Sequence, residues 1–436
     1  MIPSTRLVLL VAASSPLWFL AAIAPQALPI PVAYVCVLIA FCLAGYLATP
    51  GAKRISVRRA LPFRFSLDSE QEVRLTLSNH SRRRISVELR DDVPDALVLR
   101  EAVPPFGMEP GETKEVGYTV RAARRGAVGF RWVSCRIGHG AALIKRQIRV
   151  VEQSKGKVYP CFMGVDRFNL LAVMDRREES SRTPRTAKGQ GSDFESLRPY
   201  VPGDDLRRME WKVSAKRGTL ITRNMQVERG QQLAILIDAG RFMTEPLGTR
   251  SRFEHAVGAA VMLASVAQKR GDAVSLACFS NRIESFMPTI RGSAILPRVL
   301  DALADVQPRA VESDYWHAFA GIVSRLHKRS LIVLMSEVLD RAGSSGLINN
   351  MVRSARKHLI LCVVLSNRNL ADAAEQIPED LGQSYRKAAA SHVALERVLA
   401  LHDMRSKGIM VLETDPEHFS LHLVNKYLEI RRANLL

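Results

Sequence analysis

The chain has 436 residues, of which 47% are apolar and 24% charged, so its composition excludes an intrinsically disordered protein and suits two or three domains. Its formal net charge is +19, and residues 53–150 alone carry 20 basic against 11 acidic side chains. Six scattered cysteines form no Cys-x-x-Cys pair, which argues against a zinc cluster and against a secreted disulfide framework. We therefore expect a multidomain protein of a reducing compartment.

Residues 1–52 predict a transmembrane helical hairpin. No charged side chain lies between Arg6 and Lys53, and a proline-bearing turn divides this segment into two apolar runs, at about 7–24 and 28–48. Each run is near the ~20 residues that cross a bilayer. A cleaved signal peptide is the alternative, because Ala22-Ile23-Ala24 resembles a cleavage site, but a second apolar run follows directly.

The basic residues around these runs indicate their orientation. Arg6 precedes the first run and four basic residues follow the second, whereas the turn between the runs carries none. By the positive-inside rule, both ends of the hairpin lie in the cytoplasm. We therefore expect an integral membrane protein with both termini and its soluble domains on the cytoplasmic side.

Residues 53–152 predict an all-β, immunoglobulin-like sandwich of about seven strands. Apolar and polar residues alternate in short runs, such as 72–77 and 85–89, and turn residues separate the runs. The basic run Arg82-Arg83-Arg84 has no interleaved aromatic residues that would stack nucleic acid bases. We expect this surface to face anionic lipid headgroups and to bind no specific nucleic acid.

Residues 153–230 predict a charged connector that contains a dense motif at 189–223, GQGSDFESLRPYVPGDDLRRMEWKVSAKRGTLITR. Asp204 and Asp205 suit the start of a short helix after the turn at Pro202-Gly203, and Gly218 suits its end. The two carboxylates also fit a metal or acid–base site, but the basic residues around them favour an ion-pair network.

This motif resembles the signature of the bacterial family catalogued as domain of unknown function 58. The resemblance implies paired helices in the inner membrane, a sandwich, a domain similar to von Willebrand factor type A, and a MoxR-type AAA+ ATPase as partner. We expect the signature to dock the two soluble domains around Trp211, or else to contact a partner. The matching residues are Asp193, Phe194, Leu197, Arg198, Pro202, Gly203, Asp204, Arg207, Trp211 and Arg217.

Residues 231–436 predict a doubly wound α/β domain. Short aliphatic strands alternate with amphipathic helical stretches, one of them long, at 370–401. This pattern predicts a parallel sheet covered by helices on both faces, with ligands at the carboxyl ends of the strands. The expected strands lie at 233–237, 273–279, 331–335, 359–365 and 409–412.

In the resembled type A domains, those strand ends hold a magnesium-type cation through an Asp-x-Ser-x-Ser loop, a Thr and a later Asp. The corresponding positions here are Asp238, Ser313 and Glu337, but Gly240 and Phe242 replace the two loop serines, and neither can ligate a cation. We therefore expect no functional metal site and no cofactor. Instead, Asp238 should cap its loop and Glu337 should pair with an arginine.

The sequence contains no P-loop, Gly-x-Ser-x-Gly or His-Glu-x-x-His motif. We therefore expect a non-enzymatic, membrane-anchored interaction or scaffold protein. With a MoxR-type ATPase, it would serve the assembly or maturation of an envelope-associated complex. The alternative is an enzyme of unknown reaction that uses the carboxylates of Asp204 and Asp205 or of Asp238.

Overall fold

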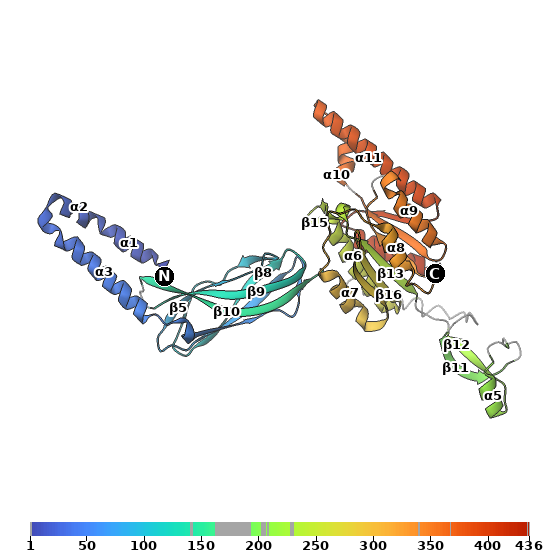
Figure 1. Ribbon diagram of the computed structural model, residues 1–436, viewed down its shortest axis with the longest axis horizontal. Coiled ribbons are helices and arrows are strands. Elements are labelled where there is room, and N and C mark those ends of the chain that lie inside the picture. The colour runs from blue at the N-terminus through green and yellow to red at the C-terminus, as the bar shows by residue number, and fades with distance from the viewer. Residues whose placement is uncertain are drawn as a thin grey trace. The chain divides into compact units, whose positions relative to one another are not determined.

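Two compact units make up the chain, Met1–Cys161 and Phe162–Leu436, and Figure 1 shows their elements. The structure is a computed structural model. It describes residues 2–139, 143–161, 193–201, 206, 209–226, 231–338, 341–366, 368–433 and 435.

Two apolar helical segments begin the first unit (Figure 1). The first comprises α1 (Thr5–Ala13) and α2 (Ser15–Ile23), and the second is α3 (Pro29–Ala48). Each segment is long and apolar enough to cross a membrane, and most of its apolar side chains are exposed. The prediction of two apolar helices is confirmed. A pair of this kind near the N-terminus fits a membrane anchor and also a signal sequence.

A sheet-rich region follows, built from two sheets. The first has the strand order β2-β4-β8-β6, and the second has the order β1-β10-β9-β5-β7, with β3 beside β10. The first sheet contains β2 (Ile55–Ala60), β4 (Glu70–Asn79), β6 (Leu97–Glu101) and β8 (Thr113–Ala122). The second contains β1 (Ile2–Pro3), β3 (Phe65–Ser66), β5 (Ile85–Asp91), β7 (Phe106–Met108), β9 (Gly126–Gly138) and β10 (Ile144–Tyr159).

One hydrophobic core joins the two sheets, because both contribute their inward-facing residues to it. The alternation read from the sequence therefore located a genuine buried face, as in β2, where buried and exposed residues alternate strictly. Among the described residues, β2 to β10 make nine strands instead of about seven, since β3 and β7 are too short to show alternation. Strand β10 also continues beyond residue 152, paired with β9.

The second unit contains a six-stranded sheet of order β17-β16-β13-β18-β19-β20. Its strands are β13 (Gln232–Asp238), β16 (Ala273–Phe279), β17 (Ile283–Ile290), β18 (Leu331–Met335), β19 (Leu359–Leu365) and β20 (Met410–Thr414). All neighbours are parallel except β17, which runs antiparallel to β16. The sheet is therefore mixed, and the expectation of a parallel sheet missed β17, a half-buried strand with a proline.

Helices cover both faces of this sheet, and two minor strands, β14 (Pro246–Leu247) and β15 (Arg250–Ser251), pair beside it. On one face lie α6 (Arg252–Arg270), α7 (Ile295–Ala304) and α12 (Phe419–Arg432). On the other lie α8 (Tyr315–Val323), α9 (Arg341–Ala355) and α11 (Leu381–Ser406).

The long helix expected at 370–401 is divided into α10 (Arg368–Glu375) and α11, because Pro378 interrupts it.

The described residues of the motif at 189–223 form a small module. Strands β11 (Asp193–Pro199) and β12 (Ile221–Gln226) pair antiparallel, and α5 (Trp211–Arg217) lies between them in sequence. The Ser214 hydroxyl donates to the Glu210 carbonyl and accepts the Ile221 backbone N–H, so it ties α5 to β12. As predicted, Gly218 ends the helix, in the left-handed conformation with φ of 66°.

Candidate functional site

Two buried carboxylates lie at the carboxyl edge of the six-stranded sheet. Asp238 is the last residue of β13, and Glu337 follows the neighbouring strand β18. Because these two strands are parallel, their carboxyl ends meet at one edge of the sheet. Both residues are almost wholly buried, so each must be neutralised or hydrogen-bonded by its surroundings.

Four donors surround the Asp238 carboxylate. Its Oδ1 accepts hydrogen bonds from the backbone N–H of Gly240, at 2.8 Å, and from the Ser313 hydroxyl. Its Oδ2 accepts hydrogen bonds from the hydroxyls of Ser336, at 2.6 Å, and Tyr315, at 3.0 Å. Two donors to each oxygen satisfy most of the capacity of a carboxylate without a counter-cation.

The N-terminus of α8 supplies part of this shell. Asp314 caps the helix by accepting the backbone N–H of His317, and this places Ser313 and Tyr315 on either side of the cap. Burial, and then the neighbouring Asp238 carboxylate, raise the pKa of Tyr315 well above its ordinary value. The phenol therefore stays protonated and acts as a hydrogen-bond donor.

Gly240 is tightly enclosed in the loop after β13. A Cβ atom added there would lie closer than 3.0 Å to the Ser313 hydroxyl oxygen, and 3.0 Å from the carbonyl oxygen of Val311. The backbone of Gly240 is extended, with φ of −80°, so the constraint is space and not backbone conformation. The Ser313 hydroxyl thus occupies the space that a side chain at residue 240 would fill.

We expect Gly240→Ala to destabilise the α/β unit by about 1–3 kcal/mol, because the new methyl group overpacks the loop. Ser313→Gly in the same chain should recover part of this loss by removing the clashing hydroxyl. Hydrogen exchange of the β13 amides in the full chain measures both effects. Additive losses in the double variant would show that the two positions do not compete for space.

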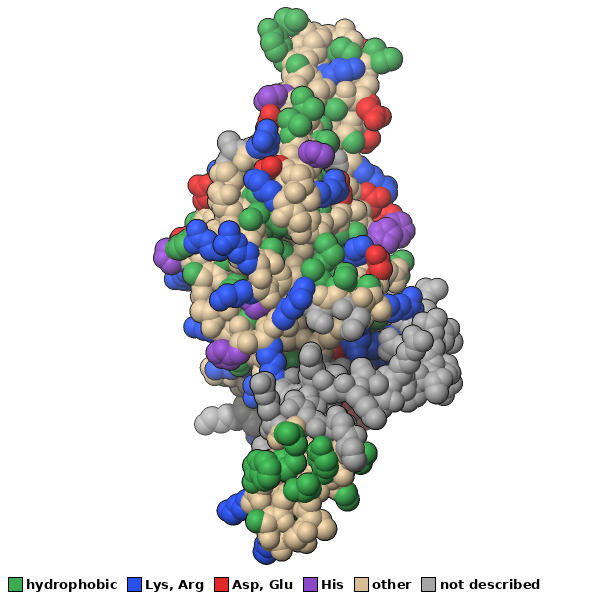
Figure 2. Space-filling view, turned by 90° about the vertical axis from the view of Figure 1, so that its right-hand side faces the viewer, with side chains coloured by type: hydrophobic (Ala, Val, Ile, Leu, Met, Phe, Trp, Pro, Cys, Tyr) green, Lys and Arg blue, Asp and Glu red, His purple; other side chains and the backbone are tan. Residues whose placement is uncertain are grey.

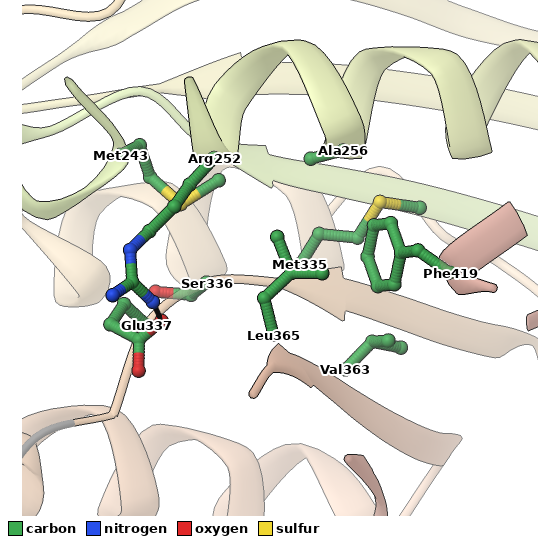
Figure 3. A pocket seen from close by; sticks show the side chains of 9 residues that line it. All are labelled: Met243, Arg252, Ala256, Met335, Ser336, Glu337, Val363, Leu365 and Phe419. Carbon is green, nitrogen blue, oxygen red and sulfur yellow. Dashed lines mark hydrogen bonds and ion pairs between the residues drawn. The ribbon is translucent and has the colours of Figure 1, made fainter. Parts of the chain in front are cut away.

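Two arginines neutralise Glu337. The Glu337 carboxylate forms ion pairs with Arg252 from α6 and Arg397 from α11, and all three side chains are buried (Figure 3 shows Arg252 and Glu337). Arg397 also donates to the carbonyl of Leu365, at 2.7 Å, and lies 3.3 Å from the carboxylate of Glu413. Glu337 therefore links a helix from each face of the sheet.

The space beside Glu337 is too small for a substrate. Figure 3 shows Arg252, Ser336 and Glu337 facing a cavity that is otherwise lined by apolar side chains. Its volume is ≈ 10 Å³, which is room for about one water molecule, whereas small-molecule sites measure roughly 300–1,000 Å³. This cavity, as the described residues form it, is therefore much smaller than an ordinary small-molecule site.

The structure brings Ser313 to Asp238 and gives Glu337 separate partners. Arg241, which follows Gly240 in the loop after β13, is exposed, and its guanidinium stacks over the ring of Phe242, at 4.6 Å. The sequence reading missed Tyr315 and Ser336, which are sequence neighbours of the named positions. It also missed Arg252 and Arg397, which no sequence motif marks.

We expect magnesium titration of the full chain to give no site that depends on Asp238. One carboxylate already engaged by four donors offers little of the oxygen coordination that magnesium requires. Within the described residues, no three His, Cys, Asp or Glu side chains are grouped to hold a metal ion. Calorimetry checks this with Asp238→Asn as the control, and micromolar binding abolished by that variant would contradict it.

The signature module exposes apolar side chains. Trp211 is 64% exposed at the start of α5, so its own module does not bury it. Figure 2 shows hydrophobic side chains gathered on this module, at the lower end of the view. The exposed apolar residues there are Leu197, Val201, Leu206, Trp211 and Leu220, which we call the Trp211 patch.

Several residues of the signature are not described in full. Pro202, Gly203, Asp204, Asp205 and Arg207 lie outside the described residues. The backbones of Asp193 and Phe194 belong to β11, but their side chains also lie outside the described part. Two further members are placed: Arg198 donates to the carbonyl of Pro199, at 3.4 Å, and Arg217 is exposed in the last turn of α5.

Comparison with known proteins identifies relatives of unknown function. The family model described as "Protein of unknown function DUF58" matches residues 196–384. The uncharacterized protein YeaD of Bacillus subtilis is 26% identical over 191 residues, which are 43% of this chain and 45% of YeaD. The alignment thus spans less than half the length of YeaD. The uncharacterized protein Rv1480 of Mycobacterium tuberculosis is 23% identical over 57% of this chain and 82% of its own length.

Solved structures give weaker likenesses. A PapD-like domain of human CEP192 is 14% identical and covers 25% of this chain and 87% of that domain, with a TM-score of 0.19. A structure of Escherichia coli alpha-2-macroglobulin is 17% identical and covers 26% of this chain and 17% of that one, with a TM-score of 0.21. TM-scores this low assign no fold.

Proposed function

We propose that this chain is a non-enzymatic, membrane-anchored interaction protein that uses the Trp211 patch to bind a protein partner. The partner we propose is a MoxR-type AAA+ ATPase, and the assembly would serve the maturation of an envelope-associated complex. In this proposal the sheet-rich region is an immunoglobulin-like sandwich, and the α/β unit is of the von Willebrand factor type A kind. Both would lie on the cytoplasmic side of the inner membrane.

The observation that carries the proposal is the exposure of Trp211 within the family signature. Tryptophan is among the residues most enriched at binding hot spots, and such residues are surrounded by contacts that exclude water. Trp211 shares its module with other exposed apolar residues, and α5 also carries the exposed basic residues Lys212, Lys216 and Arg217. An apolar centre with a basic rim suits a partner surface that is apolar with acidic edges.

The carboxyl edge of the sheet supports a non-enzymatic role. Of the three carboxylates considered for acid–base chemistry, Asp238 lies among the residues that the structure describes. Its carboxylate is buried and accepts four hydrogen bonds. The cavity beside Glu337 leaves no room for a substrate. Buried carboxylates whose oxygens are all hydrogen-bonded in this way stabilise a domain. Asp238 therefore gives no support to the enzymatic alternative.

Arginines beside the apolar helices support the proposed membrane anchor. Arg146 of β10 lies 4.1 Å over the ring of Tyr46, and Arg83 donates to the carbonyl of Ala48, at 3.1 Å. Both contacts are near the C-terminal end of α3, where the chain would leave the bilayer. Each such cation gains about 1 kcal/mol from anionic headgroups, so these residues are proposed to face them.

We expect Trp211→Ala to weaken binding of the purified full chain to the ATPase at least tenfold, because truncation of a hot-spot tryptophan costs about 2 kcal/mol or more. Trp316→Ala is the matched control. Trp316 is 51% exposed on α8 and belongs to a different surface, so its loss should change affinity less than about twofold. Biolayer interferometry in detergent, with and without ATP, measures both affinities.

The melting temperature separates a binding effect from a folding effect. Since both tryptophans are exposed, neither variant should melt more than a few degrees lower than the parent chain. If the parent chain binds the ATPase in neither nucleotide state, the proposed partner is wrong. If it binds and both variants bind equally well, the Trp211 patch is not the docking surface.

A further inference from the structure

The helix α11 has two apolar faces, and one of them is exposed. Its inner face packs into the core of the α/β unit through buried residues such as Ala400, Leu401 and Met404. The N-terminal half of α11 and the neighbouring α10 project beyond the sheet and the other helices of this unit (Figure 1). A helix that packs within a single domain needs one apolar face, so the second face is a candidate for contact with a partner.

The residues of the exposed face follow the spacing of a coiled coil. They recur at alternating intervals of four and three residues, which keeps them on one side of the helix. Tyr385 is 71% exposed and Leu395 is 57% exposed. We call these six exposed positions the α11 stripe, and they are Leu381, Tyr385, Ala388, His392, Leu395 and Leu399.

The α11 stripe is symmetric about residue 390. Its intervals are the same when read in either direction, so two copies of α11 that pair antiparallel bring each stripe position opposite another stripe position. Small side chains at the centre allow the two helices to approach closely there, and larger apolar side chains lie outside them. The facing residues are Ala388 and His392, Tyr385 and Leu395, and Leu381 and Leu399, in each case one from either copy.

Two charged residues beside the stripe are complementary in the same antiparallel pair. Arg386 and Glu396 each follow a stripe residue directly, so they lie on the same side of the stripe. Arg386 is four positions before residue 390 and Glu396 is six positions after it. Arg386 of one copy is therefore within about 3 Å, measured along the helix axis, of Glu396 of the other copy. The pairing occurs twice, and opposite charges beside a coiled-coil seam select the orientation of the helices.

We infer that the α11 stripe binds a second copy of this chain, with the two α11 helices antiparallel about a two-fold axis at residue 390. Each copy contributes the same surface, as in other symmetric dimers. An anionic membrane suits this surface less well. Helices that lie on such membranes carry mainly Lys and Arg beside their apolar face, whereas the exposed end of this helix pair carries Glu375, Glu379 and Asp380.

Sedimentation velocity of the purified full chain, in a density-matched detergent, tests self-association. We expect a monomer–dimer equilibrium in the micromolar range. Leu395→Ala should weaken it at least about tenfold, because the two-fold axis makes one substitution remove two contacts. Leu99→Ala is the matched control. Leu99 is 45% exposed on β6 and lies outside the stripe, so its loss should change the dissociation constant less than about twofold.

A charge exchange tests the antiparallel register. Arg386→Glu and Glu396→Arg should each weaken self-association, because either change places two like-charged pairs across the axis. A mixture of the two variants restores both opposite-charge pairs, so the mixed dimer should be about as stable as the parent dimer. Energy transfer between differently labelled variants measures the mixed dimer, and each variant labelled in both colours is the control.

Three outcomes would overturn the inference. The first is a chain that stays monomeric throughout the micromolar range, and the second is a dimer that Leu395→Ala leaves unchanged. The third is a mixture of the charge variants that associates no better than either variant alone. If the chain is monomeric and Leu395→Ala weakens its binding to the ATPase, the stripe serves that partner instead. The self-association measurements contain no ATPase, so they are independent of the proposed function.

Discussion

Replacing Glu337 by alanine is expected to lower the free energy of unfolding of the α/β unit by about 3–5 kcal/mol. The reason is that Arg252 and Arg397 are buried and would lose the one buried carboxylate that they share, so that each keeps only a partly exposed partner, Glu245 or Glu413. A buried charge that loses its buried partner keeps its desolvation penalty, and a partly exposed carboxylate offsets that penalty only in part. Hydrogen exchange of the β18 amides in the full chain measures the effect, because it reports on this unit alone.

A matched control is available at Glu413. Its carboxylate also lies near Arg397, at 3.3 Å, but its side chain is 39% exposed, so Glu413→Ala should cost less than about 1 kcal/mol. A second variant separates charge from packing. Glu337→Leu combined with Arg252→Met and Arg397→Met should recover most of the loss, since an apolar replacement of a buried ion cluster is often neutral.

Equal small losses for Glu337→Ala and Glu413→Ala would contradict this account of the cluster. They would mean that water reaches the two arginines and screens them. In that case Glu337 would not be the link between α6 and α11, and the carboxyl edge would be open enough to admit polar ligands.

The sequence predicted those parts of the fold in which local pattern and burial agree. The strands β13, β16, β18 and β19 are continuous aliphatic runs, and a run buried on both faces needs no other signal. Strand β17 was missed, because an edge strand with a half-buried face shows neither continuous burial nor clear alternation.

The site was less predictable, because its partners come from distant parts of the chain. Arg397 lies 60 positions after Glu337, in the middle of a helix whose pattern is polar, and nothing local marks it as buried. Trp211 shows a different limit. Its residue type marks it as an apolar contact residue, but a short helix in a small module has no core large enough to bury it, and the local sequence does not say what covers it.

Asp238→Ala is expected to destabilise the α/β unit by at least about 3 kcal/mol. The change removes the acceptor of four hydrogen bonds at once, from the Gly240 N–H and the hydroxyls of Ser313, Tyr315 and Ser336. Each buried donor left without a partner costs roughly 1–3 kcal/mol, although the hydroxyls recover part of this by rotating toward one another. Exchange of the β13 amides measures the loss.

Asp238→Asn should cost clearly less than Asp238→Ala, because its carbonyl oxygen can still accept from Gly240 and Ser313. Its amide group can donate to Tyr315 and Ser336, whose hydroxyls also accept. Tyr315→Phe removes one donor and should cost about 1 kcal/mol. If Asp238 holds the loop after β13 to α8 and β18 by hydrogen bonds, Asp238→Ala must cost clearly more than either Asp238→Asn or Tyr315→Phe. If Asp238→Ala is as stable as the parent chain, the carboxylate does not stabilise the fold. Asp238 would then again be a candidate ligand-binding residue.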